Sequence, residues 1–341
     1  MSNRIGRSVR DLIYSAILSA TIMAKYTFFP KMGNPGYLIR NYRLEDFDKL
    51  VDLGAKFGRL RQDSCCASLQ DWIEDLGKPD HFPEDNLFVA ERAGNILGYV
   101  DVMPELGIGR VVLKYLVHPE HHRKGLAKRL VECGIQRARE LRVKAAHVNI
   151  PQDDAMAKGL LSRMGFRCVR RYVELRLDLS EAHMPTLCHT LPRCHHLEPG
   201  QEERLTQIQN RSFVNTWGYN PNTKEEVIYR TGLPSSSPED IVLAYEDDKP
   251  VGYCWTKTNV TEDKAMSGNK GRIYMLGVDP DHRGKGVGKQ VLVAGLSHLK
   301  SKGIRTVELT MNSENEAACA LYRSVGFEVC GSSLWYEKVL S

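Results

Sequence analysis

A glycine-rich segment near the C-terminus has the residue types and spacing of an anion-binding site. It spans 278–289 and follows an apolar run, 273–278, that indicates a strand. A helical pattern follows it, and free backbone N–H groups at a helix start, together with the helix dipole, favour a bound anion. Arg283, Lys285 and Lys289 add full positive charges. The sequence therefore predicts that this loop binds a phosphate or pyrophosphate.

A weakened copy of this segment lies upstream, at 117–128. When the two are aligned, Gly125 and Ala127 take the places of the last two loop glycines. His122 replaces the loop arginine and Arg123 replaces the glycine after it. A repeat at such a long period indicates two duplicated domains rather than a solenoid.

A second group of residues, Asn315, Ala318, Tyr322 and Gly326, follows the loop at the C-terminal end of the chain. Ala318 and Tyr322 are one helical turn apart and therefore share a helix face. Gly326 can end that helix, and Asn315 can cap it or bind a ligand amide. An ordinary amphipathic helix with a packed tyrosine is the structural alternative. The order and distance from the loop favour a ligand site.

The elements that must position these residues occur in the same order in both halves. Hydrophobic periodicity and turn residues predict a mixed α/β class, with each half built on one mostly antiparallel sheet flanked by helices. The first half is expected to contain strands at 38–43, 87–91, 96–102, 110–117, 145–150 and 172–178. Its helices are expected at 45–53, from the end of the first loop to about 141, and at 154–164. The second is expected to contain strands at 241–245, 250–256, 273–278, 306–311 and 333–339, with helices at 202–213, 289–300 and up to 324.

These motifs resemble those of the GNAT superfamily of acyl-CoA N-acyltransferases, arranged in tandem. The family loop R/Q-x-x-G-x-G/A is matched by 283–288, and its Asn-x-x-Ala-x-x-x-Tyr pattern is matched downstream. The resemblance implies two GNAT folds, each with a splayed central strand, and acetyl-CoA as co-substrate. It also implies a set of cofactor-binding residues: Leu276, Gly277, Val278, Arg283, Gly284, Lys285, Gly286, Val287, Gly288, Lys289, Asn315, Ala318 and Tyr322.

The chemistry implied by the resemblance is direct attack of a neutral amine on a thioester carbonyl. Tyr322 would act as general acid toward the leaving thiolate. The backbone N–H of Val278 would hold the carbonyl oxygen as negative charge builds on it. Holding both reactants in register would supply much of the rate.

A narrower resemblance is to the mycothiol synthase family, which are two-domain GNAT enzymes. It rests on 271–280 and 210–221, but Arg272 stands where that family carries a glutamate base. A water chain is then the default route for the amine proton. Glu308 and His282 are weaker alternatives, for which a structural or solvent-facing role is the expectation.

Aromatic residues offer candidates for the acceptor side of the site. Trp217, Tyr219 and Trp255 would line an acceptor pocket, although buried core positions are at least as well supported. The acceptor is expected to be a small-molecule or peptide amine. A non-catalytic acyl-CoA sensor or scaffold is the alternative function. A nucleoside-triphosphate enzyme is disfavoured, because the loop lacks the G-x-x-x-x-G-K-[ST] order.

The N-terminal copy departs at the decisive positions. Leu161 stands where Tyr322 stands in the second half, and Asp154 replaces Asn315. Arg123 adds a side chain where a glycine would allow close backbone approach. The N-terminal half is therefore expected to be catalytically silent and mainly structural. Binding of a second acetyl-CoA there stays open, because loop room and positive charge remain.

Length and pattern divide the chain of 341 residues into two domains with flanking segments. The expected divisions are an N-terminal extension at 1–36, a degenerate GNAT domain at 37–180, a linker at 181–200 and a catalytic GNAT domain at 201–341. A hydrophobic content of 42% and a charged content of 26% are typical of a soluble globular protein.

Charge and cysteine content argue against other classes of partner. The net charge of +5 comes from scattered basic residues and does not indicate a nucleic acid partner. Cys188 and Cys194, with histidines at 189, 195 and 196, form a Cys/His-rich patch whose spacing fits no common zinc pattern. We therefore expect reduced thiols and no metal.

The N-terminal extension resembles a signal peptide, with three arginines before a short apolar run at 12–24. That run is too short for a stable membrane span. A loosely docked helix, or a true start at Met23 or Met32, is favoured. A cytoplasmic location is expected, because the pyrophosphate loop needs a cytosolic cofactor.

Overall fold

The chain forms two compact units, which we describe separately from a computed structural model. The structure describes residues 36–61, 69–180, 192–233, 235–258 and 270–340. One unit contains the residues up to Val148 together with the C-terminal end from Val339. The other runs from Asn149 to Lys338. The expectations for 1–35, Cys188 and its neighbour at 189 lie outside the described residues.

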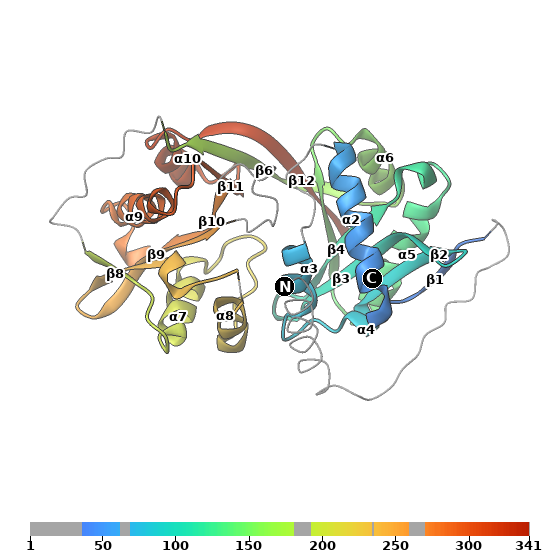
Figure 1. Ribbon diagram of the computed structural model, residues 1–341, viewed down its shortest axis with the longest axis horizontal. Coiled ribbons are helices and arrows are strands. Elements are labelled where there is room, and N and C mark those ends of the chain that lie inside the picture. The colour runs from blue at the N-terminus through green and yellow to red at the C-terminus, as the bar shows by residue number, and fades with distance from the viewer. Residues whose placement is uncertain (1–35, 62–68, 181–191, 234, 259–269, 341) are drawn as a thin grey trace, which may run out of the picture. The chain divides into compact units, whose positions relative to one another are not determined.

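The first unit is built on strands in the order β1-β2-β3-β4-β5 (Figure 1). Neighbouring strands are antiparallel, except that β4 and β5 are parallel. The strands are β1 (Leu38–Asn41), β2 (Leu87–Arg92), β3 (Asn95–Glu105), β4 (Arg110–Val117) and β5 (Ala145–Pro151). The helices are α2 (Phe47–Arg61), α3 (Leu69–Leu76), α4 (Pro83–Asn86) and α5 (Leu126–Glu140), with 3-10 turns at Leu44–Asp46, Leu106–Ile108 and Pro119–His121.

Both faces of this sheet are covered. Leu113 and Val100 contact α5 at Gly134, where an added Cβ would lie 3.1 and 3.2 Å from their methyl groups. On the other face Trp72 packs edge-on against Tyr99 at a centroid distance of 4.9 Å. The alternation of side chains between the two faces therefore builds one core on each side of the sheet.

The second unit contains the glycine-rich loop, on a sheet with the order β12-β6-β11-β10-β9-β8-β7 (Figure 1). The strands are β6 (Arg167–Asp178), β7 (Arg193–His196), β8 (Ile241–Glu246), β9 (Lys249–Thr258), β10 (Lys270–Val278), β11 (Thr306–Asn312) and β12 (Glu328–Val339). The helices are α6 (Ala155–Arg163), α7 (Glu202–Ser212), α8 (Lys224–Thr231), α9 (Val287–Ser301) and α10 (Glu316–Arg323), with 3-10 turns at Pro238–Asp240 and Pro280–His282.

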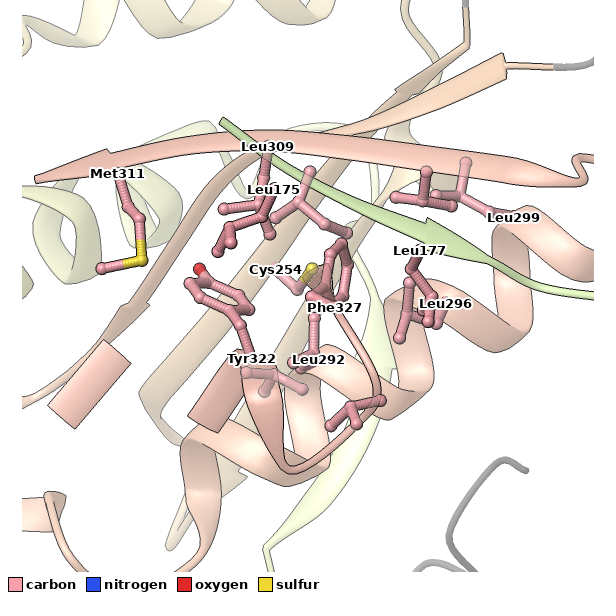
Figure 2. Close-up of a cluster of buried hydrophobic side chains, with 14 of the residues drawn as sticks. Leu175, Leu177, Cys254, Leu292, Leu296, Leu299, Leu309, Met311, Tyr322 and Phe327 are labelled. Carbon is pink, nitrogen blue, oxygen red and sulfur yellow. The ribbon is translucent and has the colours of Figure 1, made fainter. Parts of the chain in front are cut away.

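Two apolar clusters cover the faces of this sheet. One lies under α9 and α10 and includes Leu175, Leu309, Leu292 and Tyr322 (Figure 2). The other lies under α7 and α8: Leu205, Ile208, Val227, Ile241, Leu243, Tyr253 and Trp255. Burying a leucine in such a cluster typically contributes about 2–5 kcal/mol, measured as the cost of its replacement by alanine.

The expected mixed α/β class with mostly antiparallel pairing is confirmed, but one strand lies outside the expected grouping. β6 ends the first sequence repeat, yet it pairs antiparallel with both β11 and β12 of the second unit. Its alternate residues Val173, Leu175 and Leu177 complete the cluster under α9 and α10. The chain therefore passes from one compact unit to the other at residue 148, whereas the predicted division at 180 follows the sequence repeat and stays a prediction.

Other differences from expectation are local. The helices α3, α4 and α8 were not predicted. β7 lies inside the predicted linker, where it adds an edge strand beside β8. α9 begins two residues before the predicted start, directly after Gly286. Within the described ranges, no helix combines the length and apolar character that a membrane crossing requires.

Candidate active site

The strand that precedes the glycine-rich loop separates from its parallel neighbour. β10 pairs with β11 only from Lys270 to Arg272, whose last partner is Glu308. Beyond that point β10 continues to Val278, paired with β9 alone, and a register shift between Ile273 and Met275 marks a bulge. The edge of β10 that faces β11 is therefore left without a strand partner over 273–278 among the described residues.

The backbone of Val278 faces this open edge. The N–H of the next residue, Asp279, donates to the Val251 carbonyl of β9 at 2.9 Å. Backbone groups alternate in direction along a strand, so the N–H and C=O of Val278 point away from β9. In agreement, the Val278 carbonyl accepts a hydrogen bond from Arg283 Nε at 3.3 Å rather than from β9. The Val278 N–H is oriented to bind a ligand between the splayed strands.

Gly277 is a point of close approach. A Cβ added there would lie 2.6 Å from Tyr253 Cε1 and 2.7 Å from Ser212 Cβ, closer than real Cβ contacts allow. Tyr253 is fully buried and Ser212 is the last residue of α7. The glycine therefore lets the end of α7 rest directly on β10, beside the open edge.

The loop between β10 and α9 presents unpaired backbone donors. Gly284 and Gly286 have φ values of +74° and +87°, in the left-handed region that favours glycine. The first i→i−4 bond of α9 is donated by the N–H of Gln290 to the carbonyl of Gly286, at 3.1 Å. The N–H groups of residues 287–289 thus have no partner within the helix. Lys285 and Lys289 are exposed and make no ion pair with a described residue.

The Arg283 side chain hydrogen-bonds the protein backbone, so it is not free to bind a phosphate in this structure. Its Nη2 donates to the Ser212 carbonyl at 2.7 Å, in addition to its contact with Val278. The side chain therefore ties the end of α7 to the strand–loop junction. Its predicted contact with a pyrophosphate stays a prediction.

α10 carries the second predicted group of residues. The Asn315 side chain caps the helix by accepting a hydrogen bond from the Ala318 N–H at 3.1 Å. Tyr322 is 7% exposed and packs edge-on against Phe327 at 5.6 Å. Figure 2 shows its hydroxyl directed toward the side of the cluster where Met311 lies, away from Leu299. No described residue hydrogen-bonds this hydroxyl, and burial raises the Tyr322 pKa well above its ordinary value. It is a protonated donor at neutral pH.

Neither alternative base is free of ionic partners. Glu308 lies 2.8 Å from Arg176 and 3.5 Å from Lys270. His282 Nε2 lies 2.7 Å from Glu246. These contacts are consistent with the structural or solvent-facing role expected for both residues.

The aromatic acceptor candidates separate into two kinds. Trp255 is fully buried in the cluster under α7, so its proposed place in an acceptor pocket is wrong and the core interpretation is correct. Tyr219 is half-buried, stacks on Phe213 at 5.0 Å and donates to Asn210 at 2.8 Å. Trp217 is partly buried.

The N-terminal loop before α5 has a backbone conformation similar to that of the loop before α9, but features of the candidate site are absent from the described residues around it. Gly125 has a φ of +78° and precedes α5, and Arg123 adopts a φ of +59° where the second loop has glycine. His122 Nε2 lies 2.9 Å from the Val117 carbonyl, which matches the contact of the loop arginine with its own strand. However, β4 pairs with β3 without a register shift, and the fully buried Leu161 offers no hydroxyl.

Sequence reasoning missed the ion pairs that fix the loop entry. Arg211 at the end of α7 pairs with Asp279 and, at 2.5 Å, with Asp281. Burial alone would raise the pKa of Asp279, but hydrogen bonds from Arg211 and from the Asp281 N–H hold it below its ordinary value. The partners are about 70 positions apart, and no local pattern indicated them.

Only part of the Cys/His-rich patch, from Cys194 to His196, lies within the described residues. Cys194 is half-buried, and burial raises its pKa to about 11. His196 Nδ1 lies 2.6 Å from the Glu239 carbonyl. Among the described residues, no group of three or more His, Cys, Asp or Glu could hold a metal ion.

Residues 50–166 and 203–327 both match the model of the acetyltransferase (GNAT) family. The chain belongs to this family and carries two GNAT domains in tandem. Family membership supports an acyltransferase enzyme rather than the non-catalytic sensor. GNAT acetyltransferases use acetyl-CoA or another acyl-CoA as the acyl donor.

Similar proteins agree with this assignment. A mycothiol acetyltransferase of Saccharomonospora viridis is 30% identical over 256 residues, covering 72% of this chain and 80% of the relative. One from Stackebrandtia nassauensis is 28% identical over 300 residues, covering 86% and 94%. The fold is similar to a GCN5-related N-acetyltransferase from Sphaerobacter thermophilus, with a TM-score of 0.70, 22% identity and coverage of 89% and 95%. It is also similar to a tandem GNAT protein from the clavulanic acid biosynthesis pathway, with a TM-score of 0.66, 15% identity and coverage of 89% and 98%.

Proposed function

We propose that this enzyme transfers an acetyl group from acetyl-CoA to a primary amine of a small molecule or peptide. The chemistry would take place in the C-terminal GNAT domain. The observation that carries the proposal is the open edge of β10, toward which the Val278 N–H points beside an unpaired helix N-terminus. One strand thus offers an extended binding edge, an oxyanion donor and an anion site in sequence.

The cofactor would lie along this strand and loop. The pyrophosphate would accept hydrogen bonds from the unpaired N–H groups of 287–289, with Lys285 and Lys289 supplying charge. The pantetheine arm would pair with the open backbone of Leu276 and Val278. Asn315 and Ala318, at the start of α10, would border the arm near its thiol end.

The transfer step would form a C–N bond and break the C–S bond of the thioester. As the amine attacks, the carbonyl oxygen would gain charge and accept a hydrogen bond from Val278 N–H. The thiolate would leave toward the Tyr322 hydroxyl, which its raised pKa keeps protonated and able to donate. The amine proton would pass to water, because Glu308 is paired with Arg176 and His282 Nε2 is within hydrogen-bond distance of Glu246.

The similar proteins favour a small-molecule acceptor. The curated relatives are named mycothiol acetyltransferases, and they cover most of the chain. Arg272 stands where the mycothiol synthase family carries a glutamate, so the acceptor of this chain need not be the same. Arg272 is exposed and its Nη2 lies 3.4 Å from Thr310 Oγ1.

The N-terminal domain would be catalytically silent. Leu161 replaces the hydroxyl donor, and β4 lacks the bulge present in β10. Calorimetric stoichiometry with acetyl-CoA would distinguish one binding site from two. A value near two would mean that the N-terminal loop, with Gly125 in its left-handed conformation, still binds the cofactor.

The function is tested by thiol release from acetyl-CoA across a panel of primary amines. The wild type should release CoA only when an accepted amine is present, and acetylated amine should form in equal amount. Gly286→Glu places a carboxylate in the anion site and should abolish acetyl-CoA binding in calorimetry. Wild-type affinity in that variant would show that the cofactor site is assigned wrongly.

A further inference from the structure

Three aromatic side chains from distant parts of the sequence meet in the second unit. Tyr172 on β6, Trp217 after α7 and Trp335 on β12 form this aromatic triad. The ring centroids of Tyr172 and Trp217 are 6.5 Å apart, those of Tyr172 and Trp335 are 6.0 Å apart, and those of the two tryptophans are 5.8 Å apart. The Arg170 guanidinium lies 5.4 Å from the Trp217 ring centroid. All three residues are partly buried.

The triad lies on the face of the sheet opposite Tyr322. Val173 and Leu175 on β6 belong to the cluster under α9 and α10, so their neighbour Tyr172 points to the other face. Tyr172 pairs in register with Asn312 of β11. Asn312 lies four residues beyond Glu308, about 13 Å along the strand at ~3.3 Å per residue. The triad is therefore beside the part of β11 from which β10 has separated.

The segment after α7 crosses this separation. Ser212 rests on Gly277 of β10, as the close Cβ contact shows, whereas Trp217 contacts β6 and β12. The residues between them must pass over the unpaired edges of β10 and β11 on the α7 face.

Polar contacts hold this crossing segment in place. Asn210 Oδ1 accepts hydrogen bonds from Tyr219 Oη and from the Asn222 N–H, both at 2.8 Å. Asn210 Nδ2 donates to the Asn222 carbonyl at 2.9 Å. Phe213 stacks on Tyr219 inside the loop. These hydrogen bonds and the ring stacking hold the loop that carries Trp217 in one conformation.

We propose that the aromatic triad is the acceptor-binding surface, and that the acceptor carries its amine beside a ring with an apolar face. This inference rests on the proposed function. The thioester would lie between β10 and β11, with its leaving thiolate directed to Tyr322 on one face of the sheet. The attacking amine must then approach from the other face, where the triad lies. Flat aromatic rings bind the apolar faces of other rings better than they bind a flexible chain.

The proposal gives the N-terminal sequence repeat a direct role in recognition. Tyr172 and Arg170 belong to β6, the last strand of that repeat, yet they lie in the sheet of the catalytic domain. The repeat that has Leu161 in place of the general-acid tyrosine would thus supply part of the acceptor surface of the other repeat.

The experiment uses three primary amines of similar basicity: 2-phenylethylamine, 2-cyclohexylethylamine and n-hexylamine. Their affinities for the CoA-saturated protein are measured by calorimetry, which needs no turnover. We expect at least one ring amine to bind about tenfold more tightly than the linear amine. The phenyl and cyclohexyl arms distinguish an aromatic from a saturated ring. Equal affinities for all three would overturn the proposal.

Variants then connect the ring preference to the triad. Trp217→Leu and Tyr172→Leu should remove the preference and raise KM for the ring amine about tenfold, with acetyl-CoA affinity unchanged. Trp217→Phe should restore most of it, which a merely structural role would not predict. Tyr245→Leu, which removes a half-buried ring on β8, is the matched control and should keep the preference.

The outcomes separate this inference from the proposed function. A retained ring preference in Trp217→Leu and Tyr172→Leu would refute the triad even if acetyl transfer proceeds. Ring-selective binding without any CoA release would support the triad and count against the transferase proposal. Calorimetry with acetyl-CoA on each variant verifies that the domain remains folded.

Discussion

Replacement of Gly277 by alanine should damage the site through packing alone. The new Cβ would lie 2.6 Å from Tyr253 Cε1 and 2.7 Å from Ser212 Cβ. Neither neighbour can move freely, because Tyr253 is fully buried and the Ser212 carbonyl is held by Arg283 at 2.7 Å. Overpacking of this kind costs about 1–3 kcal/mol. The end of α7 or the strand at Val278 must shift to accommodate it.

The activity of the Gly277 variant should fall more than its stability. Val278 follows directly, and misplacement of a catalytic group by 1 Å can cost about 10²-fold in rate. Urea unfolding gives the free energy of unfolding, and thiol release at saturating acetyl-CoA gives kcat. Gly159→Ala on α6 is the control, since its new Cβ would meet only the flexible end of Arg163 at 3.3 Å. Unfolding free energy and kcat both equal to wild type in Gly277→Ala would refute the close-contact argument.

Three further predictions address the loop, its ion pairs and the shared strand. Gly286→Ala should weaken acetyl-CoA binding and cost about 1 kcal/mol of stability, because its φ of +87° is unfavourable for alanine; equal calorimetric Kd values would contradict this. The lowered pKa of Asp279 stabilises the fold above its unfolded pKa of about 3.9, and this contribution is lost as the pH falls through the folded value. Arg211→Leu should therefore lose less stability than wild type between pH 5 and 2 in urea titrations, and parallel curves would disprove it. A fragment of residues 181–341 lacks β6 and should not unfold cooperatively by circular dichroism, whereas a fragment of 149–341 should; cooperative unfolding of the shorter piece would contradict the shared-strand account.

Local patterns predicted the features that depend on neighbouring residues. The left-handed loop glycines before α9 follow from local backbone conformation, and the Asn315 cap follows from its position before a helix. Hydrophobic periodicity predicted the shared order of the main strands and longer helices in each half, but it did not predict α3, α4, α8 or the edge strand β7. The features that were predicted are encoded within short windows of sequence.

Features that join distant residues could not be predicted. The placement of β6 depends on its competition for partners β11 and β12, and nothing in its own alternation indicates which sheet it joins. The ion pair of Arg211 with Asp279 and the contact of Tyr172 with Trp335 likewise depend on tertiary packing. The sequence left both a pocket and a core position open for Trp255, because a buried aromatic residue and a pocket aromatic residue have the same sequence pattern; the structure places it in the core.

The central claim is that Tyr322 assists departure of the thiolate in the C-terminal domain. Tyr322→Phe keeps the ring that packs on Phe327 and removes only the hydroxyl, so folding and acetyl-CoA affinity should remain. In thiol-release kinetics with an accepted amine, we predict a decrease in kcat of about 10²-fold or more. Leu161→Ala, which alters the matching position of the N-terminal domain, is the companion variant and should retain kcat if it folds. Undiminished kcat in Tyr322→Phe would contradict the account.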